Sequence, residues 1–449
     1  MSRSDSAAAA IGDAPAGWLQ RVTRARPDEI RASLWAFACF FALLAAYYVL
    51  RPIRDEMAIQ VGQARLHELF TAVFVTMLAV APVFGWLTRT FPRKRLLPWL
   101  YAFFVANLVG FFAIFEAGGV QDGPTARAFF VWVSVFNLFA VSVFWSLMAD
   151  LFDTAQAQRL YGFIAAGGTA GALAGPSLTA LFVTAVGAKG MLLVSAGFLC
   201  VTILAVMRLR AWAARTGAAG TAEEAPIGGS IWAGLTDVVR SPYLLGICLF
   251  LFAYSLLSTF LYFQQAALVP AAIADSAERT RLLALVDLAV NVLTLAIQVF
   301  AFGALIRKLG TTFMLCAMPV VSIVGFVALA LAPGLATLVA FGIARRAGEY
   351  AVSKPARETL FNALPPEQKY KAKNVIDTLV HRFGDTSSTW IFAGLRSAGM
   401  SLGTMTWLAV PVAGAWLAVA SWLGRQHRER TAAPKVGSDS SYRNSEIRV

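Results

Sequence analysis

Residues 335–352 read LATLVAFGIARRAGEYAV, which has the length and apolar character of a membrane-crossing helix but holds two adjacent arginines in its interior. Counted from the Pro333-Gly334 turn, Arg345 and Arg346 lie about 11 residues in, roughly 16 Å at about 1.5 Å per residue and close to the bilayer midplane. A cation at that depth costs on the order of 2.5–3.5 kcal/mol even on lenient insertion scales. Proteins rarely retain a buried charge at this cost for packing alone. The stretch therefore predicts a polar cavity inside a helix bundle and a negatively charged ligand that binds there.

The composition of the whole chain supports a membrane setting. Of its 449 residues 58% are hydrophobic and only 14% are charged, whereas soluble domains carry about 25% charged residues. The mean hydropathy is +0.65. Windows of about 20 residues predict twelve spans, at 33–50, 68–88, 96–115, 128–149, 160–184, 189–207, 243–266, 282–305, 313–332, 335–352, 376–395 and 403–423.

Basic residues in the connections predict the orientation of these spans. With an even number of spans both termini lie on one side, and the connections on that side are rich in Lys and Arg, as at 93–95, 208–215 and 369–373. The positive-inside rule therefore places both termini in the cytoplasm of a bacterial cell, with the chain a multi-pass protein of the inner membrane. The same bias explains the formal net charge of +13, so nucleic acid is not expected as a partner.

The sequence divides near its middle into two similar halves. Gly85-x-Leu87-x-Arg89 follows the second span, and Gly303-x-Leu305-x-Arg307 follows the eighth span 218 residues later. Two six-span halves are the layout of many secondary transporters. The expected divisions are a cytoplasmic segment 1–30, a first bundle 31–208, a cytoplasmic linker 209–241, a second bundle 242–424 and a disordered cytoplasmic tail 425–449.

This layout resembles the major facilitator fold, an all-α polytopic membrane protein with twelve transmembrane helices in two pseudo-symmetric six-helix halves. The two Gly-x-Leu patterns look like the cytoplasmic loop signature of that family. The family usually has an acidic residue where this chain has Arg89 and Arg307. The resemblance therefore implies a different charge network on the cytoplasmic side, with Asp150, Asp153 and Glu358 as candidate acid partners.

A narrower resemblance covers about 50 residues around the tenth and eleventh spans. The segment 349–358 reads EYAVSKPARE, and KAKNVID at 371–377 and RFG at 382–384 follow it. These stretches look like the corresponding region of the ATP/ADP translocases of plastids and intracellular bacteria, and LRPIRD at 50–55 is similar to their stretch after the first span. The resemblance implies that Arg54 and Arg382 keep basic positions of that family. Asp385 stands where the family has a lysine, which disfavours strict ATP/ADP exchange.

Polar side chains recur at helical spacing in the second half and suggest a cavity. Arg345 and Glu349 are four residues apart, as are His381 and Asp385, so each pair shares a helix face. The residues expected to bind substrate are Arg345, Arg346, Arg382, Arg54, Asn137, Asn291 and Tyr350. The residues expected to couple or gate transport are Glu349, Asp385, Asp287, His381, Arg89, Asp150, Arg307 and Glu358.

Two interpretations of the buried charges remain open at this point. Glu349 could pair with Arg382, or Asp385 with Arg345, which would lower the cost of burying each charge. Alternatively, one cation is free for a carboxylate or phosphate. His381 could relay a proton or serve only as a hydrogen-bonding residue. The small residues at 165–171 predict close helix packing around the fourth and fifth spans.

Motifs of catalysis are absent from the sequence. It contains neither a Walker loop nor an HExxH pattern, and GGTAG at 167–171 does not follow a predicted strand. The expected function is therefore secondary active transport of a small organic anion, such as a nucleotide or a phosphorylated or carboxylated metabolite, as an exchanger or with proton coupling. No cofactor or metal is expected, and the chain is expected to act as a monomer. The alternative is a membrane-embedded enzyme or lipid flippase that uses the intramembrane cluster of Arg, Glu, Asp and His.

Overall fold

The structure is a computed structural model that describes residues 26–90, 93–118, 123–216, 236, 238–376 and 380–432. Expectations for residues 1–25, for most of the linker and for the tail from 433 onward lie outside the described residues. The same is true of Asp377 and of the side chain of Arg89.

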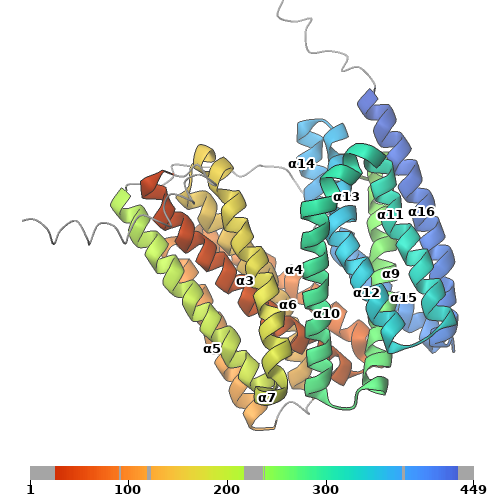
Figure 1. The fold of residues 1–449 in the computed structure, drawn as a ribbon, viewed down its shortest axis with the longest axis horizontal. Helices are drawn as coiled ribbons and strands as arrows, with labels where there is room; N and C mark the ends of the chain where they lie inside the picture. Colours follow the sequence, from red (N-terminus) through yellow and green to blue (C-terminus); the bar gives the residue numbers. More distant parts are fainter. Residues whose placement is uncertain are drawn as a thin grey trace, which may run out of the picture. The chain divides into compact units, whose positions relative to one another are not determined.

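Every element assigned within the described residues is helical (Figure 1). Each of the twelve predicted spans coincides with helical residues in its described part. In chain order the elements are α3 (Pro27–Val61), η1 (Gln63–Arg65), α4 (Leu66–Thr90), α5 (Arg93–Glu116), α6 (Gly123–Leu151), α7 (Thr154–Thr216), α9 (Pro242–Ala272), α10 (Ser276–Ala296), η3 (Ile297–Phe302), α11 (Gly303–Leu331), α12 (Leu335–Gly348), η4 (Glu349–Ser353), α13 (Lys354–Leu360), η5 (Phe361–Ala363), α14 (Pro366–Val375), α15 (His381–Ser397) and α16 (Leu402–Ala432).

Among the described residues, eight helical segments are long and apolar enough to cross a membrane. Two of them, Thr154–Thr216 and Ser276–Leu331, are interrupted by a glycine with positive φ, Gly187 at 70° and Gly310 at 74°. A left-handed residue breaks the helix direction at low cost only when it is glycine. Each segment therefore supplies two of the predicted spans, and the two arms of α7 are visible in Figure 1.

Asp153 fixes the point at which α7 begins. Its carboxylate accepts a hydrogen bond from the Gln156 amide at 2.8 Å, and the Gln156 side-chain oxygen accepts one from the Asp153 amide at 3.0 Å. This reciprocal arrangement is a capping box, which satisfies two backbone donors that the first helical turn leaves open. Asp153 thus has a local structural role at the helix terminus, rather than only that of an acid partner.

Contacts divide the chain into two compact units, and the first contains residues 1–227 together with 262–292. In this unit the first arm of α7 packs against α3 through glycines. A methyl group placed on Gly167 or Gly171 would collide with the backbone carbonyl oxygen of Phe37 or Phe41. Small residues therefore permit the close packing that the sequence predicts, and the partner helix is α3.

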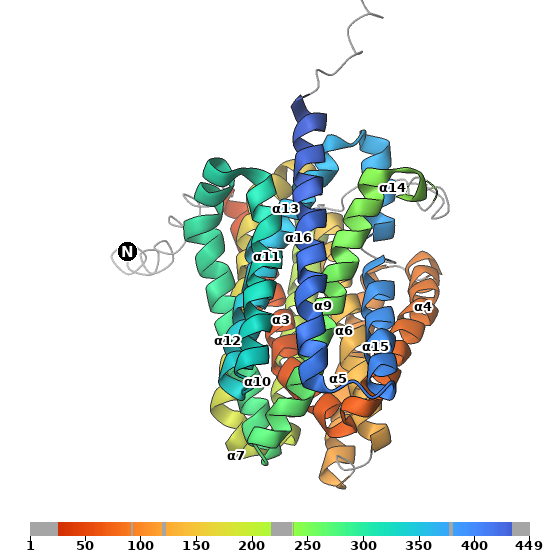
Figure 2. The same cartoon turned by 90° about the vertical axis from the view of Figure 1, so that its right-hand side faces the viewer.

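The second unit contains residues 228–261 and 293–449. Here α9, α11 and α16 lie side by side (Figure 2). Gly246 of α9 lies against the Trp422 ring, and Gly424 of α16 lies against Thr312. Phe250 and Trp416 meet with ring centroids 5.2 Å apart. These contacts hold α9 in place, and α9 carries several of the side chains described below.

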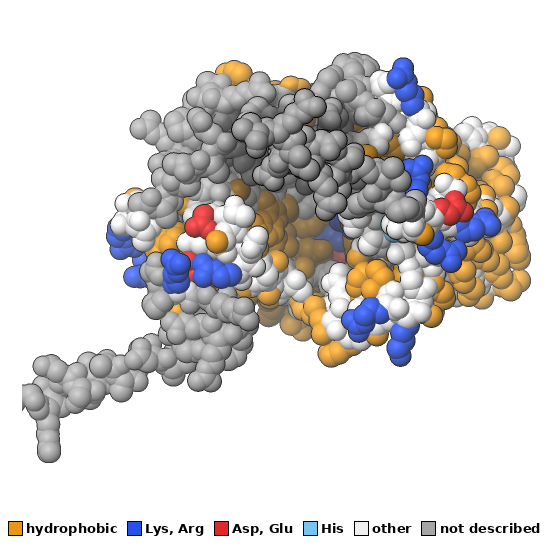
Figure 3. Space-filling model, turned by 90° about the horizontal axis from the view of Figure 1, so that it is seen from above, with side chains coloured by type: hydrophobic (Ala, Val, Ile, Leu, Met, Phe, Trp, Pro, Cys, Tyr) orange, Lys and Arg blue, Asp and Glu red, His pale blue; other side chains and the backbone are white. Residues whose placement is uncertain are grey.

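Charged and apolar side chains are separated on the surface. On the end of the molecule drawn in Figure 3, Lys and Arg side chains gather at helix ends, while hydrophobic side chains lie along the flanks. Large apolar residues such as Trp99 and Phe300 are 76% and 84% exposed. Extended apolar surface of this kind is expected where lipid tails replace water.

Candidate functional site

Arg345 is the most deeply buried of the predicted cationic ligands in the second unit. It lies near the end of α12 and is 3% exposed. Its Nη2 donates a hydrogen bond to the Ser258 hydroxyl at 2.7 Å, and its guanidinium carbon lies 5.2 Å from the centroid of the Tyr254 ring. Its Nε and Nη1 are buried and have no hydrogen-bond partner among the described residues.

No carboxylate of the described residues forms an ion pair with Arg345. A buried cation without a counter-ion is energetically costly, and leaving a buried donor unsatisfied costs about 1–3 kcal/mol. The two open nitrogens can each donate a charge-assisted hydrogen bond to a carboxylate or phosphate oxygen. The geometry therefore fits an anion better than any other ligand.

Helix α9 supplies the residues that hold this guanidinium. Tyr254 and Ser258 are four residues apart and so lie on one face of α9, with Ser255 beside them. These three residues were not among the predicted site residues, because isolated Ser and Tyr are common in apolar helices. Their spacing of three and four residues was the available signal.

His381 and Asp385 of α15 form a second polar group on the same face of α9. The Ser255 hydroxyl donates to the Asp385 carboxylate at 2.9 Å, and His381 Nδ1 lies 3.3 Å from that carboxylate. The His381 and Tyr254 ring centroids are 6.5 Å apart. Gly384 permits this approach, because a side chain there would press on Ser255. Tyr254 thus lies between the cation and the histidine–aspartate pair.

Glu349 pairs with Arg357, which the sequence reasoning did not select. The Arg357 Nη1 and Glu349 Oε1 atoms are 3.5 Å apart, and the residues are 4% and 5% exposed. The two predicted alternatives, Glu349 with Arg382 and Asp385 with Arg345, are not the pairs observed. Glu349 begins the π-helical turn η4, and its partner Arg357 lies on the following helix α13, whereas the predicted pairs joined the tenth and eleventh spans.

The other predicted residues of the second unit occupy more open positions. Arg346 and Arg382 are partly buried, and Tyr350 is 38% exposed with its backbone carbonyl accepting from Gln298 at 3.3 Å. Glu358 is bound to Lys373 at 2.5 Å. Arg307 is exposed and forms no ion pair with a described residue.

The first unit gathers a separate set of charges around the end of α3. Arg54 contacts the adjacent Asp55 at 2.7 Å, and the Tyr262 hydroxyl donates to the same carboxylate at 3.3 Å. Arg51 lies 3.5 Å from Asp287, which is 2% exposed. Arg54 is therefore already engaged by an acid.

The remaining predicted residues of the first unit do not join this set. The Asn291 amide donates to the Ala172 carbonyl at 2.7 Å, which ties α10 to α7. Asn137 is partly buried in α6 and has no side-chain hydrogen bond to the described residues. Asp150 is partly buried near the end of α6. Of the predicted site residues, Arg345, His381 and Asp385 thus lie beside Tyr254 and its neighbours on α9, and Arg54 and Asp287 lie among the charges of the first unit.

Comparisons with known proteins agree with this fold. A sequence profile described as Major Facilitator Superfamily matches residues 30–366, about three quarters of the chain. The ADP,ATP carrier protein 2 of Chlamydia trachomatis serovar D (strain ATCC VR-885 / DSM 19411 / UW-3/Cx) is 28% identical over 92 residues. That match covers 20% of this chain and only 17% of the chlamydial protein.

Solved structures resemble the chain over nearly its whole length. The nucleoside transporter NupG has a TM-score of 0.61 and 11% identity, covering 91% of this chain and 100% of that one. The POT family transporter PepTSo has a TM-score of 0.63 and 15% identity, covering 89% and 98%. A bacterial homologue of the iron transporter ferroportin, in an inward-facing state, has a TM-score of 0.61 and 16% identity, covering 91% and 100%. At these identities the likeness confirms the predicted fold class and says nothing of the substrate.

Proposed function

Because the chain belongs to the Major Facilitator Superfamily, a family of secondary transporters and not of enzymes, we propose that this multi-pass membrane protein carries a small organic anion by alternating access. The anion would bind to the Arg345 guanidinium. Family membership removes the alternative of a membrane-embedded enzyme.

The observation that carries the proposal is the unsatisfied pair of nitrogens on Arg345. Ser258 occupies Nη2 and Tyr254 covers one face of the guanidinium, so its orientation is fixed while Nε and Nη1 stay available. Nε–H shares a guanidinium edge with Nη2 and not with Nη1, so Nε and Nη1 can each donate a separate hydrogen bond to an anionic oxygen. A preorganised donor pair loses little side-chain entropy when it binds.

The substrate class follows from the buried positive charge and its two open donors. A carboxylated or phosphorylated metabolite offers negatively charged acceptor oxygens, and a nucleotide is one member of that class. The partial likeness to a chlamydial protein named as an ADP,ATP carrier supports the nucleotide option. The position of Asp385 weighs against strict ATP/ADP exchange, although His381 lies 3.3 Å from it and would offset its charge when protonated.

Coupling would act through two acid–base pairs of the same unit. The Glu349–Arg357 pair is buried, and the His381–Asp385 pair is partly exposed. Either pair could exchange partners with the anion or take up a proton, which would link binding to a conformational change. We further propose that the chain lies in a bacterial inner membrane as a monomer, with two six-helix halves and both termini in the cytoplasm; the basic connections support this orientation.

The test uses purified protein in detergent and in proteoliposomes. A thermal-shift panel of nucleoside phosphates, sugar phosphates and dicarboxylates identifies a ligand, whose uptake is then measured. Arg345→Gln should abolish the ligand-induced shift and lower uptake on the order of 100-fold, as expected when a charged hydrogen-bonding partner is lost.

Arg396→Gln is the matched control, because Arg396 lies at the end of α15 and donates to the Met400 carbonyl. It should keep the uptake of the unmodified protein. Wild-type uptake by Arg345→Gln, or a panel in which only cations or neutral solutes bind, would overturn the proposal. A lipid-scrambling assay on the same proteoliposomes separates solute transport from lipid flipping.

A further inference from the structure

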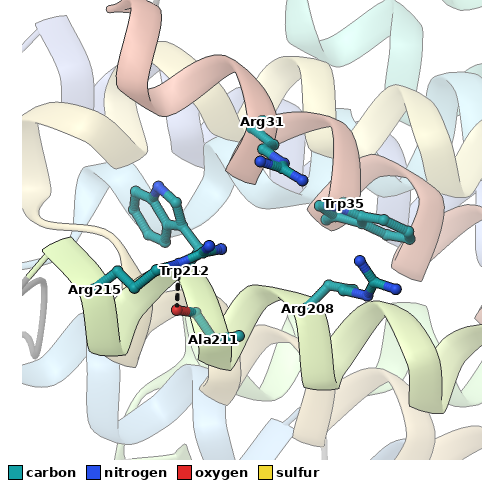
Figure 4. Close-up of a pocket in the computed structure, with 6 residues that line it drawn as sticks. All are labelled: Arg31, Trp35, Arg208, Ala211, Trp212 and Arg215. Carbon is teal, nitrogen blue, oxygen red and sulfur yellow. Dashed lines mark hydrogen bonds between the residues drawn. The ribbon is translucent and has the colours of Figure 1, made fainter.

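A pocket of about 470 Å³ lies between α3 and the second arm of α7 in the first unit (Figure 4). Its lining is formed by three arginines, two tryptophans and one alanine: Arg31, Trp35, Arg208, Ala211, Trp212 and Arg215. Among the described residues, no acidic side chain lines it. Neither the substrate proposal nor the predicted site residues involve this pocket.

The three arginines place positive charge around one small space. Arg31, Arg208 and Arg215 are each exposed, and none forms an ion pair with a described residue. Other basic side chains of the same unit do form ion pairs, such as Arg159 with Glu29 at 3.0 Å. Three like charges without a counter-ion repel one another, and an anion among them would relieve that repulsion.

The tryptophans position this charge at a membrane boundary. The Arg208 guanidinium lies 5.8 Å from the Trp35 ring centroid, and Trp212 is buried at the base of the pocket. Figure 4 shows the Arg31 and Arg208 side chains extending toward the same space from opposite helices. Tryptophan is enriched at the headgroup level of the bilayer, because its ring is apolar and its N–H is polar.

Three exposed apolar side chains lie about one helical turn from pocket-lining residues, on the side toward the middle of the helices: Leu34, Leu204 and Met207. Helix α3 begins at Pro27, so Leu34 lies farther along it than Arg31; α7 ends at Thr216, so Leu204 lies farther inside than Arg208. Leu34 and Leu204 are each 44% exposed, and Met207 is 56% exposed. A soluble phosphate would make no apolar contact with these side chains, whereas the acyl chains of a lipid would cover them.

We propose that this pocket binds the phosphate headgroup of an anionic phospholipid, with the acyl chains lying along Leu34, Leu204 and Met207. The arginines would contact the phosphate oxygens, and the two indole rings would border the glycerol. Basic pockets between transmembrane helices recognise anionic headgroups in this way. The lipid would hold the N-terminal end of α3 against the C-terminal end of α7.

The test compares lipid binding by the full chain and by charge-matched variants. Purified protein is titrated with phosphatidylglycerol, phosphatidylcholine and glycerol phosphate, and bound lipid is counted by native mass spectrometry. The triple variant Arg31→Gln, Arg208→Gln, Arg215→Gln should weaken phosphatidylglycerol binding roughly fivefold for each arginine removed. The control triple variant Arg210→Gln, Arg425→Gln, Arg428→Gln removes the same charge outside the pocket and should leave that affinity within about twofold.

Three outcomes would overturn the proposal. Equal loss in both triple variants would show that general surface charge attracts the lipid. Equal affinity for phosphatidylcholine would show that net negative charge is not recognised. Binding of glycerol phosphate as strong as that of phosphatidylglycerol, and lost in the pocket variant, would assign a soluble phosphate site instead. Melting curves of each variant without lipid verify that the fold is intact, and Arg208→Lys, which keeps the charge, should bind with intermediate affinity.

Discussion

Arg279 and Glu56 form a buried ion pair with Nη2 and Oε1 2.6 Å apart, although 223 residues separate them in the chain. Glu56 is fully buried, and it also accepts a hydrogen bond from the Ser276 hydroxyl at 2.8 Å. Nη1 of the same arginine donates to the Ile273 and Ala274 carbonyls at 3.1 and 2.7 Å. One guanidinium therefore ties the end of α3 to the connection between α9 and α10, inside the first unit.

Removing Glu56 should destabilise this unit strongly. Glu56→Ala leaves the Arg279 charge largely buried without a counter-ion, and breaking a buried pair in this way costs about 3–5 kcal/mol. The measurement is the unfolding midpoint in detergent, followed by tryptophan fluorescence. Glu68→Ala is the control, because Glu68 and Arg127 form an exposed pair at 3.6 Å that is worth under about 1 kcal/mol. Similar midpoints for the two variants would contradict the structural role of Glu56.

The Tyr254 ring should matter to anion binding more than its hydroxyl. Tyr254→Leu removes the cation–π contact that orients Arg345, so the dissociation constant of the identified anion should rise about tenfold. Tyr254→Phe keeps the ring and should bind within about threefold of the unmodified protein. Isothermal titration of both variants measures the difference. If Phe weakened binding as much as Leu, the hydroxyl and not the ring would be the functional group.

The His381–Asp385 pair predicts a pH-dependent uptake. Histidine is the side chain that ordinarily changes charge near neutral pH. At low pH the imidazolium compensates Asp385; as the pH rises that charge is lost, the carboxylate is left to repel the anion, and uptake falls. His381→Gln removes the titrating group, so its uptake should stay nearly constant between about pH 6 and 8.

Uptake into proteoliposomes at a series of internal and external pH values measures this effect. His67→Gln is the control, because His67 lies on α4 of the other unit and should leave the pH profile of the unmodified protein unchanged. A profile that falls as steeply in His381→Gln as in the unmodified protein would exclude the pair as its origin.

Gly171 should tolerate no side chain. In Gly171→Ala the added methyl group meets the Phe41 carbonyl oxygen, so α3 and α7 must separate, at a cost of about 1–3 kcal/mol. Gly197→Ala is the matched control on the second arm of α7, because no atom lies within 4 Å of the position of its new methyl group. It should be neutral or gain up to about 1 kcal/mol from better helix propensity. Unfolding midpoints compare the two, and equal stability would refute close packing at Gly171.

The sequence predicted the helices well and the ion pairs poorly. Apolar length is a reliable signal because lipid offers no hydrogen bonds, so every spanning segment must satisfy its own backbone. The predicted ion pairs, Glu349 with Arg382 and Asp385 with Arg345, joined the tenth and eleventh spans. The observed partners, Arg357 for Glu349 and His381 for Asp385, depend on how the helices pack, which the sequence does not show.

Arg345 and Arg346 show the same division at the candidate site. The sequence shows that two cations lie within an apolar stretch. It does not show which of them is the more buried, because neighbouring side chains on a helix point about 100° apart. Only the packing of α9 against α12 buries Arg345 and gives it Ser258 and Tyr254, while Arg346 stays partly exposed.

The sequence by itself determined the membrane setting, the all-helical class, the positions of the spans and the presence of intramembrane charge, because each depends on local composition and on the solvent properties of lipid. The tertiary structure alone decided which cation keeps open donors, which acids are already paired and where α3 and α7 enclose a basic pocket. These features depend on contacts between helices far apart in the chain, and the free energy of a buried charge is set by the neighbours that folding brings to it.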